Sequence, residues 1–308
     1  MEIKSQNLNL FNERKSSIQE QNFPVKSYDE LNLMDSFLFE AATEKQEYAE
    51  IIAKVIIERA TGRKVKKLVV EAQKELKGIN INKHGIRMDV YTTEIDEVAE
   101  GEGITCVYDI EPNNYYDEDI PRRNRYYQSL VDSKLLPTST PYKELPDMIS
   151  IWILPYDPFN DKRMVYTVKN IVTENNQIVY NDGVTKIYLY TKGVIGGSNE
   201  LKQLLKFMES SVRDNAVDEE LTEIMNIVDV VKSDPKERKR YMGIMGVIDY
   251  EKRDAYNEGQ VCGIVKYGKQ KKLTREEVKN DIMKQFSLEE SKAEEYMLRY
   301  WEGNSINN

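Results

Sequence analysis

The chain has 308 residues, of which 40% are hydrophobic and 31% charged, and 53 acidic against 44 basic residues give a net charge of −9. This composition argues against a disordered or fibrous chain, and the length suits about two domains. One histidine and two cysteines, Cys106 and Cys262, are too few for a four-ligand Cys/His zinc site and are placed too far apart for a disulfide scaffold.

The sequence contains no targeting or membrane-spanning pattern. Residues 1–30 form a polar lead-in without the apolar region of a signal peptide. No apolar run approaches the ~20 residues that cross a bilayer. Together with the sparse cysteines, these features predict a cytoplasmic protein with no membrane partner.

The pattern of apolar residues predicts an α/β domain over residues 31–210 and a helical region over residues 211–308. A helix is expected over residues 35–60, ended by Gly62, and another over residues 121–135, with Pro121 at its first position and Asp119 as its cap. Strands are expected at residues 67–73, 87–92, 103–110, 148–154, 164–172 and 185–190. The most apolar of these, 148–154, suits a buried central strand, and the turn at residues 181–183 indicates a hairpin.

Because histidine and cysteine are nearly absent, the remaining catalytic groups are mainly carboxylates, which suit hard cations such as Mg²⁺ and Mn²⁺. Asp89 and Glu111 lie 22 residues apart (111 − 89), which fits two adjacent antiparallel strands and their loop. The two-residue period places Asp109 and Asn113 on the same face as Glu111. Such acids can hold a metal and position a water. The alternative is that they merely occupy the solvent face of a sheet.

Three arginines, at positions 122, 123 and 125, occupy the first turns of the helix expected at residues 121–135. Cations at a helix N-terminus oppose the helix dipole, so helix stability does not account for them. A bound phosphate would, because arginine makes bidentate contacts with it. Arg123 and Tyr127 are four residues apart and share one helix face. Ion pairs with the acids at positions 117–119 are the alternative explanation.

Four segments resemble the Rpn (recombination-promoting nuclease) family of the PD-(D/E)XK nuclease superfamily. In order, they are Met34-Asp35-Ser36-Phe37-Leu38-Phe39-Glu40; residues 85–90 (GIRMDV); residues 108–111 (YDIE) followed by 123–129 (RNRYYQS); and residues 151–159 (IWILPYDPF). Each segment alone is a weak signal. Their order and spacing, between about residues 33 and 206, make the resemblance specific.

The resemblance implies a restriction-endonuclease-like core, with a central mixed sheet flanked by helices, and an Mg²⁺- or Mn²⁺-dependent endonuclease that hydrolyses DNA in recombination or transposition. Asp89 matches the metal-binding aspartate of the family, and Glu111 matches the acid of its (D/E)-x-K motif. The first-helix glutamate of the superfamily corresponds to Glu47 or Glu50, of which we prefer Glu50 as a metal ligand. Arg123, Tyr127 and Gln128 match the helix signature of the family, which implies that they hold phosphate or support the acids, and we add Arg125 as a phosphate- or DNA-binding residue.

One departure from the family pattern bears on activity. The superfamily places lysine, and this family commonly glutamine, two residues after the acid, whereas this chain reads Glu111-Pro112-Asn113. Asn113 can help to position the attacking water but lacks the charge of lysine. Pro112 removes a hydrogen-bond donor, so the strand must end, bulge or lie at an edge there. The alternative function is therefore a catalytically degenerate, DNA- or protein-binding accessory protein.

Two basic runs lie outside the expected nuclease domain, at residues 236–240 and 266–275. Such runs hold a nucleic-acid backbone in some proteins and are solvated helix ends in others. The last two helices carry many acids, which is compatible with internal packing or with a homodimer.

Overall fold

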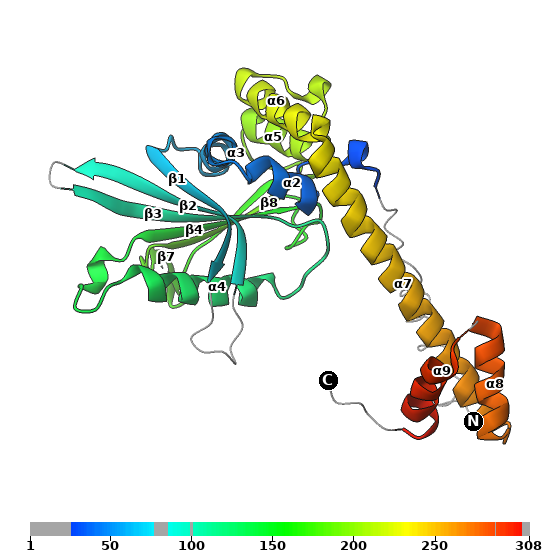
Figure 1. Cartoon of the computed structure of the whole chain (residues 1–308). Helices are drawn as coiled ribbons and strands as arrows, with labels where there is room; N and C mark the ends of the chain where they lie inside the picture. The colour runs from blue at the N-terminus through cyan, green and yellow to red at the C-terminus, as the bar shows by residue number, and fades with distance from the viewer. Residues whose placement is uncertain (1–25, 77–85, 99–100, 287, 304–308) are drawn as a thin grey trace. The chain divides into compact units, whose positions relative to one another are not determined.

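The structure is a computed structural model that describes residues 26–76, 86–98, 101–286 and 288–303 (Figure 1). The chain divides into two compact units, Met1–Arg238 and Lys239–Asn308. We expected the division near residue 210, but the first unit extends further because α6 (Glu219–Ser233) packs on α2 (Ser36–Thr43) and α3 (Gln46–Thr61).

Most of the expected polar lead-in, residues 1–25, lies outside the described residues. Its last part belongs to the folded unit, because Tyr28 is buried in the 3₁₀ turn η1 (Tyr28–Glu30). The Tyr28 hydroxyl donates a hydrogen bond of 2.9 Å to the carbonyl of Val231 in α6.

A six-stranded mixed sheet forms the centre of the first unit, in the order β1-β2-β3-β4-β8-β5. The three strands β3, β4 and β8 run parallel, and the other pairs are antiparallel. The α/β architecture expected from the sequence, a central mixed sheet flanked by helices, is confirmed. The strands are β1 (Lys67–Leu76), β2 (Ile86–Val98), β3 (Gly101–Pro112), β4 (Asp147–Leu154), β5 (Val165–Val168) and β8 (Val184–Tyr190).

Helices cover both faces of this sheet. Figure 1 shows α2, α3, α5 (Asn199–Glu209) and α6 on one side and α4 (Ile120–Leu135) on the other. The predicted central strand, β4, accordingly lies between β3 and β8, and its residues 151–154 are fully buried. Short 3₁₀ turns, η2 (Tyr142–Glu144) and η3 (Arg213–Asn215), lie in the connections.

The expected helix over residues 35–60 is two helices, α2 and α3. Lys45 adopts an extended backbone (φ −85°, ψ 128°) and begins α3, although the apolar spacing continues across the break. The predicted end of the helix is confirmed, since Gly62 adopts φ +72° and its N–H bonds to the carbonyl of Glu58. A left-handed backbone of this kind favours glycine.

The expected strand over residues 164–172 is divided into β5 and β6 (Ile171–Val172). β6 pairs with a strand that we did not predict, β7 (Asn175–Val179), in a separate two-stranded sheet. The turn at residues 181–183 therefore joins β7 to β8, whereas the hairpin partner of β8 is β5.

The second unit is helical, as expected. It contains most of α7 (Pro235–Gln270), which begins in the first unit. The elements that follow are α8 (Arg275–Phe286), α9 (Glu290–Tyr296) and the π-helical turn η4 (Met297–Trp301). Its buried cluster consists of Val261, Val265, Val278, Ile282, Ala293, Tyr296 and Met297. In the described parts of both units, no helix is both long enough and apolar enough to traverse a bilayer.

Candidate active site

Asp89 and Glu111 are direct neighbours across β2 and β3. The antiparallel register pairs Val90 with Ile110, which places Asp89 opposite Glu111. The backbone N–H of Asp89 donates a hydrogen bond of 3.1 Å to Oε1 of Glu111. The adjacent antiparallel strands predicted from the 22-residue spacing (111 − 89) are thus present.

A third carboxylate, Asp109, shares the face of Glu111 on β3. Its side chain is completely buried, and no donor among the described residues hydrogen-bonds to either carboxylate oxygen. Burial raises the pKa of Asp109 to about 7, and the nearby charge of Asp89 contributes in the same direction. Buried carboxylates normally have partners. The Asp109 carboxylate therefore has neither water nor a donor from the described residues to stabilise its negative charge.

The same crowding affects the other two acids. Burial, followed by repulsion from Asp109 and Asp89, raises the pKa of Glu111 well above its ordinary value. Burial also raises the pKa of Asp89, and the neighbouring Arg123 and Arg87 only partly oppose this. Three acids thus share a region of low dielectric in which their charges repel.

Arg123 of α4 supplies a cation to this site. Its Nη2 lies 3.6 Å from Oε2 of Glu111, and its Nη1 lies 3.5 Å from Oδ2 of Asp117. Its Nε donates a 3.0 Å hydrogen bond to the Tyr127 hydroxyl, as expected for residues on one helix face. The guanidinium also lies 5.0 Å from the ring centroid of Trp152 on β4.

These contacts keep the Arg123 side chain charged and hold its guanidinium in place. Burial alone would lower the pKa of Arg123, but its contacts with Tyr127, Glu111 and Tyr115 outweigh burial and raise it. Tyr127 donates in turn to the carbonyl of Arg87, 3.4 Å away on β2. The arginine is therefore held over the carboxylates from both the helix and the sheet.

Asn113 follows the carboxylates at the end of β3. The strand ends at Pro112, as its missing donor predicts, and the Asn113 N–H bonds to the carbonyl of Ile153, 2.9 Å away. The side-chain Oδ1 accepts from the N–H of Tyr115 at 3.1 Å. The buried Nδ2 has no hydrogen-bond partner among the described residues.

Three other predicted site residues do not join this cluster. Nε2 of Gln128 donates to Asp132 at 3.4 Å within α4, and Arg125 is exposed on that helix. Glu50 accepts a 3.0 Å hydrogen bond from Gln46 along α3. Over the described ranges, no three His, Cys, Asp or Glu side chains are grouped so as to hold a metal ion, and the expected trio of Asp89, Glu111 and Glu50 is not assembled.

Two residues that we did not select approach the site instead. Glu40 of α2 pairs with Arg87 at 3.0 Å, and its charge acts on the Asp89 carboxylate. The side chain of Gln73 on β1 accepts a hydrogen bond from Nε of Arg87 and lowers the pKa of Asp89, and its backbone adopts φ +54°. Glu40 is the last residue of the segment 34–40, one of the four that carry the family resemblance. Its place in that segment was the sequence signal that could have identified it. No feature of the sequence predicts the positive φ of Gln73.

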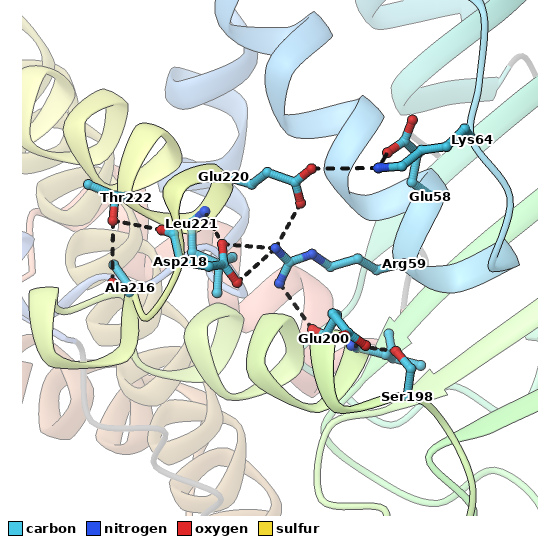
Figure 2. A network of polar contacts seen from close by, with 11 residues as sticks. Glu58, Arg59, Lys64, Ser198, Glu200, Ala216, Asp218, Glu220, Leu221 and Thr222 are labelled. Carbon is cyan, nitrogen blue, oxygen red and sulfur yellow. Dashed lines mark hydrogen bonds and ion pairs between the residues drawn. The ribbon is translucent and has the colours of Figure 1, made fainter.

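A second group of charged residues joins α3 to α5 and α6 (Figure 2). Nη2 of Arg59 bonds to the carboxylates of Asp218 and Glu220 at 2.8–3.0 Å, and Nη1 bonds to the carbonyl of Glu200 at 3.0 Å. A cavity of ≈ 510 Å³ lies beside these residues. Because both terminal nitrogens of Arg59 are engaged within the chain, this network is a structural link between helices.

Comparison of the chain with protein-family models, with curated proteins and with solved structures yields no match.

Proposed function

We propose that this chain is a metal-dependent DNA endonuclease of the PD-(D/E)XK type, acting in recombination or transposition. The observation that carries the proposal is the pairing of Asp89 with Glu111 across β2 and β3, beneath the guanidinium of Arg123. The resemblance assigns metal binding to the same two acids and assigns Arg123 to the supporting helix. The mixed sheet flanked by helices agrees with the implied fold.

The chemistry of the carboxylates suits a hard divalent cation. Asp89 and Glu111 offer oxygen ligands, which Mg²⁺ and Mn²⁺ prefer. Burial raises the pKa of both acids, and the charges of Asp109 and Asp89 raise that of Glu111 further, so a cation between Asp89 and Glu111 would offset this negative charge. The unpartnered oxygens of Asp109 lie in the same acidic cluster and add to the demand for positive charge. We assign Asp89 and Glu111 as the residues that would hold the metal.

The remaining residues have roles that follow from their positions. A bound metal would supply a hydroxide near neutral pH and offset charge on the phosphate. Arg123 is placed to donate hydrogen bonds to a phosphate oxygen, as arginine commonly does. Tyr127 holds Arg123 in position through its 3.0 Å hydrogen bond. Asn113 offers an amide donor at the end of β3 for the attacking water.

A second candidate is an inactive, nuclease-like protein that binds DNA or protein. Asn113 favours it, because its side chain has no charge, its Oδ1 is engaged by Tyr115, and its Nδ2 is buried. Replacing Asn113 with lysine or glutamine separates the two candidates. Cleavage that appears only in Asn113→Lys or Asn113→Gln indicates a degenerate site.

The direct experiment is nicking of supercoiled plasmid DNA in Mg²⁺ or Mn²⁺. We expect the unmodified chain to nick the plasmid and Asp89→Ala and Glu111→Ala to lose at least about 100-fold in rate, since each removes a metal ligand. Glu71→Ala is the matched control, because Glu71 is an exposed carboxylate on β1 whose ion pair is with Lys74. Equal cleavage by the unmodified chain and both site variants would reject the proposal.

A further inference from the structure

Two tyrosines, Tyr115 and Tyr116, are exposed immediately after Asn113. Their exposed fractions are 57% and 73%, which leaves most of both side chains in contact with water. Large aromatic side chains are usually buried for much of their area when they serve the core. Both follow the carboxyl end of β3, the edge of parallel strands at which ligands commonly bind in α/β folds.

Tyr115 is connected directly to the candidate active site. Its N–H donates to Oδ1 of Asn113 at 3.1 Å. Burial alone would lower the pKa of Arg123, but its hydrogen bond to the Tyr127 hydroxyl, the charge of Glu111 and the Tyr115 side chain together raise it. The tyrosine therefore borders the same arginine that faces Glu111.

Tyr116 is held by the neighbouring loop rather than by the core. Its ring lies 5.1 Å from the ring of Tyr156, tilted by 58°. The Tyr156 hydroxyl accepts a 3.3 Å hydrogen bond from the N–H of Asp117, and Asp117 pairs with Arg123. One side of Tyr116 thus has a fixed support while much of the ring stays open to solvent.

The charges around the two rings are compatible with a polyanion. Of the neighbouring acids, Asp117 is paired with Arg123 and Asp119 with Arg122 at 3.1 Å. Glu118 is exposed, and so is Arg125 one helical turn into α4. Arg122 and Arg123 in the first turn of α4 oppose the helix dipole, and an approaching phosphate backbone would be attracted to these arginines and to the exposed Arg125.

We propose that Tyr115 and Tyr116 stack on unpaired bases, so that the preferred substrate is single-stranded DNA or a single-stranded segment within a duplex. Stacking on an aromatic side chain requires a base whose face is accessible, and in a duplex the faces are covered by neighbouring base pairs. Every base has such a face, so this contact selects strand state and not sequence. The inference rests on the proposed function for the choice of DNA, but it concerns binding and not cleavage.

The test is binding of the full chain to a fluorescent 20-nucleotide single strand and to the matching duplex, measured by anisotropy in EDTA so that no metal-dependent cleavage occurs. We expect Tyr116→Ala and Tyr115→Ala each to weaken single-strand binding by about 5- to 150-fold, the range for loss of one stacked base. Duplex affinity should change by less than about twofold. Tyr116→Phe should retain single-strand affinity because it keeps the ring.

Tyr142→Ala is the matched control, because Tyr142 is 85% exposed in η2 and has no part in the site. Unchanged single-strand affinity in Tyr116→Ala, equal losses on single strand and duplex, or no binding by the unmodified chain would each overturn the inference. Selective loss without any plasmid cleavage would support the stacking role while rejecting the nuclease proposal.

Discussion

At the scale of single residues, the proposed nuclease site calls for a glutamate from the first helices. The sequence offers Glu47 or Glu50, and the structure adds Glu40 as a candidate. The structure places Glu40 against Arg87 and within electrostatic range of Asp89, whereas Glu50 bonds along α3 to Gln46. We therefore predict that Glu40→Gln lowers cleavage by about 10- to 100-fold, the usual effect of a residue that supports metal ligands.

Glu50→Gln serves as the comparison, and we expect it to stay within about threefold of the unmodified rate. The measurement is the rate of plasmid nicking across a range of Mg²⁺ concentrations. A larger loss from Glu50→Gln than from Glu40→Gln would restore the assignment made from the sequence.

Asp109 predicts a pH dependence of stability. Its pKa rises from 3.8 in an unfolded chain to about 7 in the folded one. Between these values the unfolded chain releases a proton that the folded chain retains, so this residue destabilises the fold progressively as pH increases through that window. Above pH 7 the penalty is constant, and below about pH 4 it is absent.

Asp109→Asn removes that titration. In EDTA, we predict that the substitution raises the melting temperature by at least about 3 °C more at pH 8 than at pH 4, given roughly 2–4 °C per kcal/mol for a domain of this size. Comparing the two pH values cancels the packing effect of the new amide. A gain that is the same at both pH values would show that folding does not raise the pKa of Asp109.

The parts of the site that were predictable depend on short-range periodicity. The 22-residue separation (111 − 89) was sufficient to pair Asp89 with Glu111 on adjacent strands, and the four-residue spacing along a helix was sufficient to pair Arg123 with Tyr127. Glu40 was not selected, because its approach to Asp89 depends on how α2 packs at the edge of the sheet.

At the scale of secondary-structure elements, the Arg59 network predicts a measurable link between α3 and α6. The Arg59 side chain is only 6% exposed, and the carboxylates of Asp218 and Glu220 are 32% and 42% exposed. Arg59→Met should lower the free energy of unfolding by about 2–3 kcal/mol, less than a fully buried pair because the two acids can be rehydrated.

Lys64→Met is the control for this substitution, because Lys64 reaches Glu58 and Glu220 from a side chain that is 79% exposed. We expect it to shift the urea midpoint by less than Arg59→Met does, because the Lys64 side chain is solvated and the buried Glu58 keeps its hydrogen bond from the Val65 N–H. An equal shift in the midpoint for both variants would mean that the burial of Arg59 does not make its ion pairs more stabilising than those of the exposed Lys64.

The element boundaries show what sequence patterns omit. The apolar spacing over residues 35–60 continues through the break between α2 and α3, because both helices bury the same kind of side chain. β7 was missed because all of its residues are exposed, which leaves no alternation of buried and exposed positions to detect.

At the scale of the whole molecule, the chain has two separate units, each with a buried core. We predict two calorimetric transitions. Ile282→Ala removes a buried side chain from α8 and should destabilise only the second unit, by about 2–5 kcal/mol. Leu204→Ala, in α5, should shift only the other transition. A single transition that moves with both substitutions would contradict independent units.

The small sheet of β6 and β7 has a practical consequence. The chain leaves the main sheet after Val168 and returns at Val184, the first residue of β8, two residues before the Lys186 that pairs with Val168. Residues 169–183 therefore begin and end on adjacent strands of the sheet. A short reverse turn can replace them without altering the strand order. An affinity tag or a fluorophore inserted at the same place would allow the protein to be immobilised or tracked, and it would leave every proposed DNA contact unchanged.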